Sequence, residues 1–330
     1  MKRSRVDPVR IGVVGLGGFG RLHALCCAGI AEAEPVALVA RRKQSLDAIR
    51  GELPDVPGWL DLGKALRESG AEAWVVASTT STHVSLTRQI LEAGCPVLVE
   101  KPLSESLEEA LSLEPLVRPD SRNVMLGHIL LFNTEFRQLA REVSSRGPLV
   151  HIACVRHRPS ASLELYPGES PFHLSMVHDL YSVLALVGRR EPVSFSSRVH
   201  RTRSGAVDLA LAHVGWEDGL LASFAASFLT PPGLPQDGYD QMEVFGEGWA
   251  ARVNANPRPL TLWDDRARSP LTLEILADPL LPSGMLAEEL RTFCRVVRGE
   301  TPVPVGATYG DALQVMRWLD RLEHSGGETC

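Results

Sequence analysis

A glycine-rich segment, Gly15-Leu16-Gly17-Gly18-Phe19-Gly20, directly follows the first apolar run of the chain. In the pattern G-x-G-x-x-G the first glycine turns tightly, the second lets the backbone approach a pyrophosphate, and the third lets a helix pack closely on a strand. An ordinary glycine-rich turn is the alternative, because the motif alone is weak evidence. Its position between a predicted strand and a predicted helix favours a dinucleotide site, with Gly15, Gly17, Phe19 and Gly20 beside the cofactor.

Three consecutive cations, Arg41, Arg42 and Lys43, stand where the second predicted strand ends, beginning 21 residues after Gly20. A site specific for NAD usually has Asp or Glu here, which binds the ribose 2′-hydroxyl. No acid is present, and Arg41 and Arg42 are able to hold the 2′-phosphate of NADP or stack on adenine. A solvated basic turn is the alternative. We therefore predict that NADP is preferred and that NAD is possible.

The elements that position these residues alternate over the first 127 residues. Short β-branched runs predict strands at 9–14, 35–39, 73–77, 96–99 and 124–126, and helical patterns lie between them at 19–28, 44–52, 62–69, 82–93 and 106–117. Ser106 and Glu109 have the spacing of a capping box for the last helix. This alternation predicts an α/β fold with a doubly wound parallel sheet of the Rossmann type, which binds ligands at the carboxyl ends of its strands.

Beyond residue 149 the pattern changes to longer alternating runs, at 149–156, 193–201, 208–216, 220–228 and 241–245. These runs predict an open, mainly antiparallel sheet. Helices are predicted at 175–187, 285–297 and 309–324, and a long loop at 230–238. We predict an NAD(P)-binding domain over 1–127 and an α+β domain for substrate binding and oligomerisation over 128–330.

Composition excludes several other classes of protein. The 330 residues include 34 basic and 40 acidic side chains, and the net charge of −6 offers no general attraction to nucleic acid or anionic lipid. The six cysteines lack C-x-x-C spacing and the neighbouring histidines lack helical ligand spacing, so no metal site is expected. No run approaches the ~20 apolar residues of a membrane helix, and no signal peptide is recognised. We expect a soluble, cytoplasmic protein with reduced thiols.

Further motifs follow the third and fourth predicted strands and enter the second domain. They are Ser78-Thr79-Thr80-Ser81-Thr82-His83, Glu100-Lys101-Pro102, Gly127-His128 with Phe132-Asn133, and Met176-Val177-His178-Asp179-Leu180. Together these motifs resemble the Gfo/Idh/MocA family, which includes glucose-fructose oxidoreductase and inositol dehydrogenases. The segments 245–248 and 289–293 also fit, so the resemblance spans nearly the whole chain. Glu-Lys-Pro is its most specific element, whereas Thr134 departs from the proline that usually follows Phe-Asn in the family.

The resemblance implies roles for individual residues. Lys101 would stand beside the nicotinamide and hydrogen-bond the reacting oxygen, while Glu100 and Pro102 fix the turn, often with a cis peptide bond before the proline. His178 would act as general acid or base, and its ordinary pKa near 6.5 suits that work. Thr79, Thr80, His83 and Glu100 would join the cofactor site, and Asn133, Lys101, His178 and Asp179 the substrate site. Taken alone, most lysines are solvated, and a histidine in an apolar helix is more often structural.

We expect Lys101 and His178 to face one another across the nicotinamide pocket, although 77 residues separate them. One position departs from the family. Many of its dehydrogenases have an Asp one turn before this histidine, and here that position is Leu174. Either the substrate is held differently, or the chemistry has been altered or lost.

The leading hypothesis is hydride exchange between the nicotinamide and a secondary alcohol or ketone of a sugar, cyclitol or related polyol. The substrate class comes from the resemblance alone. One alternative is a glycoside hydrolase that oxidises its sugar transiently and keeps its cofactor bound. Another is a non-catalytic NAD(P)-binding regulator, which Leu174 keeps open. Family members usually pair through the open sheet, so we expect a homodimer or homotetramer.

Overall fold

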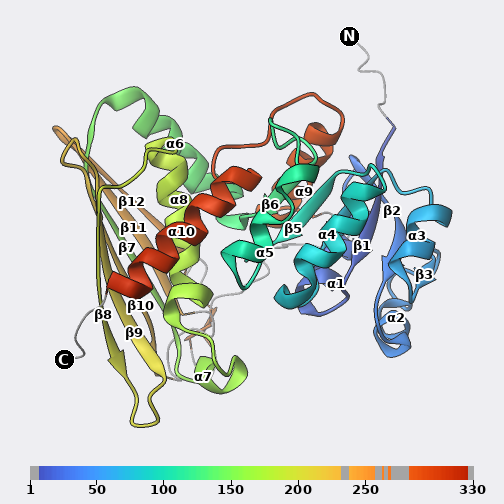
Figure 1. Cartoon of the computed structure of the whole chain (residues 1–330), viewed down its shortest axis with the longest axis horizontal. Coiled ribbons are helices and arrows are strands. Elements are labelled where there is room, and N and C mark those ends of the chain that lie inside the picture. The colour runs from blue at the N-terminus through green and yellow to red at the C-terminus, as the bar shows by residue number, and fades with distance from the viewer. Residues whose placement is uncertain (1–6, 232–237, 257–261, 264–266, 269–281, 326–330) are drawn as a thin grey trace. The chain divides into compact units, whose positions relative to one another are not determined.

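The computed structural model describes residues 7–231, 238–256, 262–263, 267–268 and 282–325 (Figure 1). The chain divides into one unit of Met1–Phe132 with Ile275–Leu313, and a second of Asn133–Glu274 with Gln314–Cys330. This division differs from a single boundary after residue 127, because the chain returns to the first unit near its C-terminus. Helix α9 (Met285–Val297) packs there against α1 (Gly18–Gly29) and β2 (Ala33–Val39). Beyond it, Thr308 forms a β-bridge with Met125.

The first unit contains a six-stranded sheet in the order β3-β2-β1-β4-β5-β6, with every neighbouring pair parallel (Figure 1). Its remaining strands are β1 (Val9–Val14), β3 (Gly58–Trp59), β4 (Ala73–Val76), β5 (Val97–Glu100) and β6 (Val124–Gly127). The order is that of a doubly wound dinucleotide-binding sheet, which confirms the predicted fold class. Strands β4, β5 and β6 are buried at every residue, as expected for parallel strands that are covered on both faces. Only β3, two residues long, escaped the sequence analysis.

The helices of this unit are α2 (Lys43–Ile49), α3 (Leu62–Glu68), α4 (His83–Glu92) and α5 (Leu107–Leu111), besides α1 and α9. The last of the predicted helices before residue 127 is shorter than expected. Ser106 caps α5 by accepting the Glu109 N–H at 3.1 Å, as predicted, but the capping box is incomplete because the Ser106 N–H donates to Ser104 Oγ. The helix nevertheless ends at Leu111 and only a 3₁₀ turn, Glu114–Leu116, follows, because Pro115 lacks the N–H that would continue the helix.

The second unit contains a six-stranded sheet in the order β12-β11-β7-β10-β9-β8. Its strands are β7 (Leu149–Pro159), β8 (Ser194–Arg201), β9 (Val207–Gly215), β10 (Leu221–Thr230), β11 (Tyr239–Gly246) and β12 (Trp249–Asn256). Only the β7–β10 pair is parallel, so the sheet is mainly antiparallel, as predicted. The predicted loop at 230–238 lies largely outside the described residues.

Helices α6 (Thr134–Arg146) and α8 (Val177–Val187), with the part of α10 (Tyr309–Ser325) from Gln314 onward, pack beside this sheet (Figure 1). A short helix, α7 (Ser162–Leu165), follows β7, and β13 (Leu262–Trp263) pairs with β14 (Ala267–Arg268). Helices α6 and α7 and strands β12, β13 and β14 were not predicted from the sequence. In the described part of the chain, none of the helices has the length and apolar character needed to span a membrane.

Candidate active site

The glycine loop lies at the carboxyl end of β1 and has the geometry of a phosphate site. Gly15 adopts φ 90°, and a Cβ added at Gly20 would lie 1.9 Å from the Gly15 carbonyl oxygen. A Cβ added at Gly17 or Gly18 would meet nothing within 4 Å. Gly17 is the N-cap of α1 and brings no capping side chain, so the helix N-terminus stays available. An open glycine surface at a helix N-terminus fits the pyrophosphate of a dinucleotide.

The basic turn follows β2, the strand that pairs with β1, and a backbone hydrogen bond connects the end of β2 to the glycine loop. The Gly15 N–H donates to the Val39 carbonyl oxygen at 2.9 Å, next to Ala40 at the end of β2. Arg41 and Arg42 are both exposed, and Arg42 is the N-cap of α2. The two guanidinium groups therefore extend from the same sheet edge as the glycine loop, where they fit the adenosine half of a dinucleotide.

His83 ties together the turns that follow β4 and β5. Its Nδ1 atom lies 2.8 Å from the Pro102 carbonyl oxygen, and its Nε2 atom lies 3.1 Å from that of Ser78. Thr79 and Thr80 lie in the first of these turns, where Thr79 is exposed. The buried imidazole thus positions both turns at the carboxyl edge of the sheet, and its predicted contact with the cofactor stays a prediction.

The Glu100-Lys101-Pro102 turn contains a cis peptide bond before the proline, as the resemblance implied. The Glu100 carboxylate folds back on this turn and accepts the Lys101 N–H at 3.2 Å. Its Oε1 atom lies 2.8 Å from His23 Nε2. A Cβ added at Gly127 would lie 2.8 Å from the same oxygen, so only glycine fits on β6 beside Glu100. The backbone of Lys101 is thereby held in place, and the half-buried lysine stands at the edge where open α/β sheets bind ligands.

Glu289 of α9 completes a buried group with His23 and Glu100, one that the sequence analysis did not foresee. One potential ligand atom from each of the three residues lies within 4.8 Å of the others, a spacing that would admit a metal ion. No metal site was expected because cysteines and histidines close together in the sequence lack ligand spacing. That comparison does not test this cluster, whose three residues are far apart in the sequence. Burial, with Glu100 nearby, raises the pKa of Glu289 well above its usual value.

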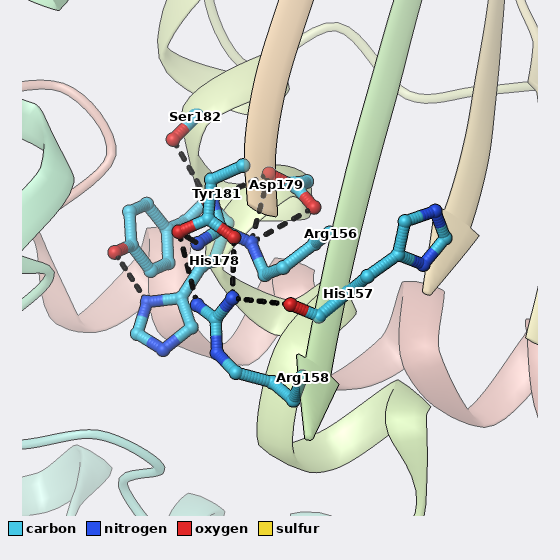
Figure 2. Close-up of polar contacts among 8 residues, drawn as sticks. Arg156, His157, Arg158, His178, Asp179, Tyr181 and Ser182 are labelled. Carbon is cyan, nitrogen blue, oxygen red and sulfur yellow. Dashed lines mark hydrogen bonds and ion pairs between the residues drawn. The ribbon is translucent and has the colours of Figure 1, made fainter. Parts of the chain in front are cut away.

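In the second unit, His178 lies in the first turn of α8 and is half-buried. Its Nδ1 atom lies 2.8 Å from the hydroxyl oxygen of Tyr181, and Ser182 donates its hydroxyl to the His178 carbonyl oxygen at 2.7 Å (Figure 2). The tyrosine contact restrains the imidazole ring and involves one of its two nitrogens. Tyr181 is a site residue that the sequence analysis missed, although its i, i+3 spacing from His178 was visible.

A buried ionic network lies beside this histidine. Arg156 of β7 donates to Asp179 from Nε and Nη2, the latter at 2.8 Å, and its Nη1 lies 2.8 Å from Asp240 (Figure 2). Arg158 also pairs with Asp240. Burial tends to lower the pKa of Arg156, but the two carboxylates outweigh it and raise the pKa, which keeps the guanidinium charged. The network joins the first turn of α8 to β7 and β11.

Asp179 and Asn133 were both predicted to contact the substrate. In the structure each contacts other residues of the protein. Asp179 is buried and belongs to the Arg156 pair. Asn133 caps α6 by accepting the Phe136 N–H at 2.8 Å, while its buried Nδ2 has no hydrogen-bond partner among the described residues. A substrate contact by either residue stays a prediction.

Leu174 lies within a π-helical turn, Phe172–Met176, that leads directly into α8. The Val177 N–H bonds to the Phe172 carbonyl oxygen five residues earlier. Since the turn is wider than an α-helical one, the four-residue spacing from Leu174 to His178 does not define which side chains share a face. Single π turns inside α-helices occur frequently at functional sites. Lys101 belongs to the first unit and His178 to the second, and their approach across a pocket stays a prediction.

Comparisons with known proteins agree with this geometry. A model of the Gfo/Idh/MocA oxidoreductase family with its NAD-binding Rossmann fold matches residues 9–128. Inositol 2-dehydrogenase 1 of Saccharopolyspora erythraea is 33% identical over 60% of this chain and 59% of its own length. UDP-N-acetylglucosamine 3-dehydrogenase of Acidithiobacillus ferrooxidans is 25% identical over 89% of this chain and 90% of its own length.

Among solved structures, scyllo-inositol dehydrogenase from Lactobacillus casei with bound NAD(H) and scyllo-inositol superposes with a TM-score of 0.83 at 19% identity. The superposition covers 97% of each chain and, at this identity, shows a shared fold. Residues 9–128 therefore match the NAD-binding Rossmann domain of the Gfo/Idh/MocA oxidoreductases, and the chain adopts the fold of a scyllo-inositol dehydrogenase along nearly its whole length.

Proposed function

We propose that this protein is an NAD(P)-dependent dehydrogenase that exchanges a hydride between nicotinamide and a secondary alcohol or ketone of a cyclitol, sugar or related polyol. One observation carries the proposal. The Lys101 backbone is clamped by Glu100 at the same sheet edge that bears the glycine loop. A lysine fixed at that edge suits a group that must hold the reacting oxygen beside a dinucleotide.

The cofactor would be held by Gly17 at the N-terminus of α1 and by Arg41 and Arg42 after β2, and when bound it supplies or accepts the hydride. Lys101 would hydrogen-bond the substrate oxygen. His178 would take or return the hydroxyl proton, with its ring restrained by Tyr181. Removing the hydroxyl proton as the hydride leaves the same carbon yields the neutral ketone and avoids a protonated, oxocarbenium-like carbonyl.

The substrate class rests on relatives whose names specify inositol and a UDP-linked sugar. Both substrates carry secondary hydroxyl groups on a six-membered ring. We accordingly propose a ring polyol and test it with a panel of inositols, free hexoses and nucleotide sugars, each supplied with NAD and with NADP. A change in absorbance at the nicotinamide band with an inositol or sugar supports the proposal, and a purified protein that binds cofactor yet oxidises or reduces nothing in the panel contradicts it.

The same purified protein also tests two other functions. A glycoside hydrolase with a retained cofactor would cleave aryl glycosides with no net change in nicotinamide absorbance. A non-catalytic regulator, the reading that Leu174 keeps open, would bind nucleotide and turn over neither substrate type. The backbone of Lys101, held by Glu100, and the imidazole of His178, held by Tyr181, favour catalysis over regulation, because each group suited to proton transfer has a defined position within its own unit.

Preference for NADP is part of the proposal. It is supported by the exposed Arg41 and Arg42 and by the absence of an acid at the end of β2. Arg41→Asp should weaken NADP(H) binding more than NAD(H) binding in fluorescence titrations, because the 2′-phosphate loses a cation and meets an anion. Arg67→Asp is a matched control, since Arg67 lies in the last turn of α3. If the parent protein binds both cofactors equally and neither Arg41→Asp nor Arg42→Ala changes these affinities, the basic turn is a solvated surface with no role in cofactor choice.

Assembly and location are further parts of the proposal. On the open sheet, Leu211, Leu221 and Phe245 are exposed, and Phe245 stacks on His151 of the neighbouring strand. An apolar sheet face of this kind supports a homodimer or homotetramer, which light scattering tests against the 36.0 kDa of a single chain. The cytoplasmic location also stays a prediction, and it agrees with the free cysteines at 26, 27, 95, 154 and 294.

A further inference from the structure

Behind the Glu100-Lys101-Pro102 turn, two carboxyl groups and an imidazole are buried together. His23 of α1 and Glu289 of α9 are both 0% exposed, and the Glu100 side chain is 12% exposed. One nitrogen or oxygen atom of each lies within 4.8 Å of the others. Glu100 has donors for both its oxygens, His23 on one and the Lys101 N–H on the other. Both Glu289 oxygens lack a hydrogen-bond partner among the described residues.

The charges in this cluster follow from that asymmetry. Two buried carboxylates at this separation repel one another, so such a pair keeps one proton. An ionised carboxylate without donors is far costlier to bury than one that accepts two N–H groups. Glu100 therefore carries the charge and Glu289 carries the proton. The raised pKa of Glu289, caused by burial and then by Glu100, agrees with this assignment.

A metal ion is the other way to neutralise two buried carboxylates. In this structure His23 Nε2 lies 2.8 Å from Glu100 Oε1, a hydrogen-bond distance that an N–H on His23 and an ionised Glu100 account for without a metal ion. The proton on Glu289 leaves the cluster with one negative charge, on Glu100, whose two oxygens are met by His23 and the Lys101 N–H.

We propose that Glu289 is a positioning residue for Lys101: as a neutral carboxylic acid packed beside Glu100, it leaves the Glu100 carboxylate free to hold the Lys101 amide. An ionised Glu289 would repel the Glu100 carboxylate and displace it from the Lys101 N–H. The consequence for turnover rests on the proposed function, whereas the consequence for the Lys101 amide does not.

Other ionisable groups lie around the cluster. Cys26 of α1 and Glu289 interact, since Glu289 contributes to the raised pKa of Cys26. His128, after β6, and Glu100 interact in the same way. On α9 the nearest charges are those of Glu288 and Arg291, which pair with one another, and Arg291 also lies 3.5 Å from Glu32 at the start of β2. The dominant charge that acts on Glu289 is therefore that of Glu100.

The first test is the stability of Glu289→Gln against pH. A carboxyl group whose pKa is raised in the folded state stabilises the fold fully below its unfolded pKa, near 4.5, and loses that contribution as the pH rises through the folded value. The free energy of unfolding of the parent, measured with urea, should therefore fall relative to that of Glu289→Gln as the pH rises from 4.5 to 9. Glu288→Gln, one residue away on α9 at a partly buried carboxylate that pairs with Arg291, should show no such trend. A constant difference between parent and Glu289→Gln over this range would overturn the proton assignment.

The second test concerns position and needs no turnover. Hydrogen exchange at the Lys101 amide, followed by NMR, should remain slow in Glu289→Gln, which keeps a neutral group of the same shape. It should be at least tenfold faster in Glu289→Ala, where Glu100 loses its packing partner. If exchange is unchanged in Glu289→Ala, Glu289 does not position this turn.

Activity and metal content complete the design. With a substrate in hand, Glu289→Gln should keep kcat within about twofold and Glu289→Ala should lower kcat more than it raises KM, since Gln restores the neutral contact. Loss of activity in Glu289→Gln, or one equivalent of divalent metal per chain in the purified protein, would overturn the proposal in favour of a carboxylate ligand. If the parent oxidises no polyol, the proposed function fails while the exchange and stability tests still decide the role of Glu289.

Discussion

The Nδ1 atom of His178 lies 2.8 Å from the hydroxyl oxygen of Tyr181, one turn further along α8. Tyr181 is 0% exposed, so its hydroxyl has little access to water and its ring offers a fixed partner. The rings meet edge to face with centroids 5.6 Å apart. The contact involves Nδ1, so under the proposed function Nε2 would be the nitrogen that exchanges a proton with the substrate.

Tyr181→Phe should lower kcat by about 2- to 10-fold, as expected for the loss of a hydrogen bond worth roughly 0.5–1.5 kcal/mol. The ring volume is kept, so cofactor affinity and the unfolding midpoint should change little. Steady-state kinetics measure the effect, and Tyr166→Phe at an exposed position of the same unit provides the control. A kcat equal to that of the parent would show that Tyr181 does not orient the histidine.

Lys101→Ala and His178→Ala should each lower turnover by roughly 10²- to 10⁴-fold, the usual contribution of general acid–base catalysis. Cofactor binding should survive both changes, because the glycine loop and the basic turn remain intact. The double variant should lose less than the product of the two single effects, since residues that act as a unit fail together. Multiplicative losses would mean that the two side chains act on separate steps, and a closed, cofactor-bound structure with His178 turned away from the nicotinamide would remove it from catalysis.

Gly17→Ala and Gly20→Ala should fail in different ways. The Cβ at Gly17 meets no protein atom within 4 Å, so Gly17→Ala should fold normally and lose dinucleotide affinity, because the added methyl group occupies the approach of the pyrophosphate. The Cβ at Gly20 would lie 1.9 Å from the Gly15 oxygen, so Gly20→Ala should lower the unfolding midpoint itself. Thermal unfolding with and without NADP separates the two outcomes, with Gly51→Ala as a control in open space. A Gly17→Ala protein that binds cofactor like the parent would show that phosphates do not approach at this glycine.

Local sequence pattern predicted the elements whose side chains alternate clearly. Strand β1 and helix α9 have the predicted bounds, because β1 is a short apolar run that ends at the glycine loop and the apolar residues of α9 recur at helical spacing. Helix α6 escaped because Phe136 and Leu139 are its only buried residues and polar residues occupy most of the rest. The π-helical turn before α8 also lay beyond prediction, since sequence spacing assumes 3.6 residues per turn.

Sequence motifs located the edge of the candidate site but not the residues behind it. The glycine loop and Glu100-Lys101-Pro102 were recognised because each is a contiguous motif. His23 and Glu289 lie 77 and 189 residues from Glu100, and no local period connects positions so far apart. Only the return of the chain to the first unit in α9 brings Glu289 to the cluster.

His128, the histidine after β6, should make the protein sensitive to mild acid. Burial lowers its pKa from 6.5 to about 4, and the Gly306 carbonyl oxygen near its Nδ1 atom only partly offsets this. The folded state therefore binds fewer protons than the unfolded state between these values, so the stabilising contribution is complete above pH 6.5 and falls as the pH drops toward 4. At about 1.4 kcal/mol per pKa unit, the loss should reach roughly 2 kcal/mol at pH 5. Urea unfolding at pH 7.5 and pH 5 should show the parent losing more stability than His128→Gln by this amount, whereas His200→Gln, whose imidazole is exposed, should behave like the parent. Equal acid sensitivity of the parent and His128→Gln would mean that protonation of other groups controls unfolding in acid.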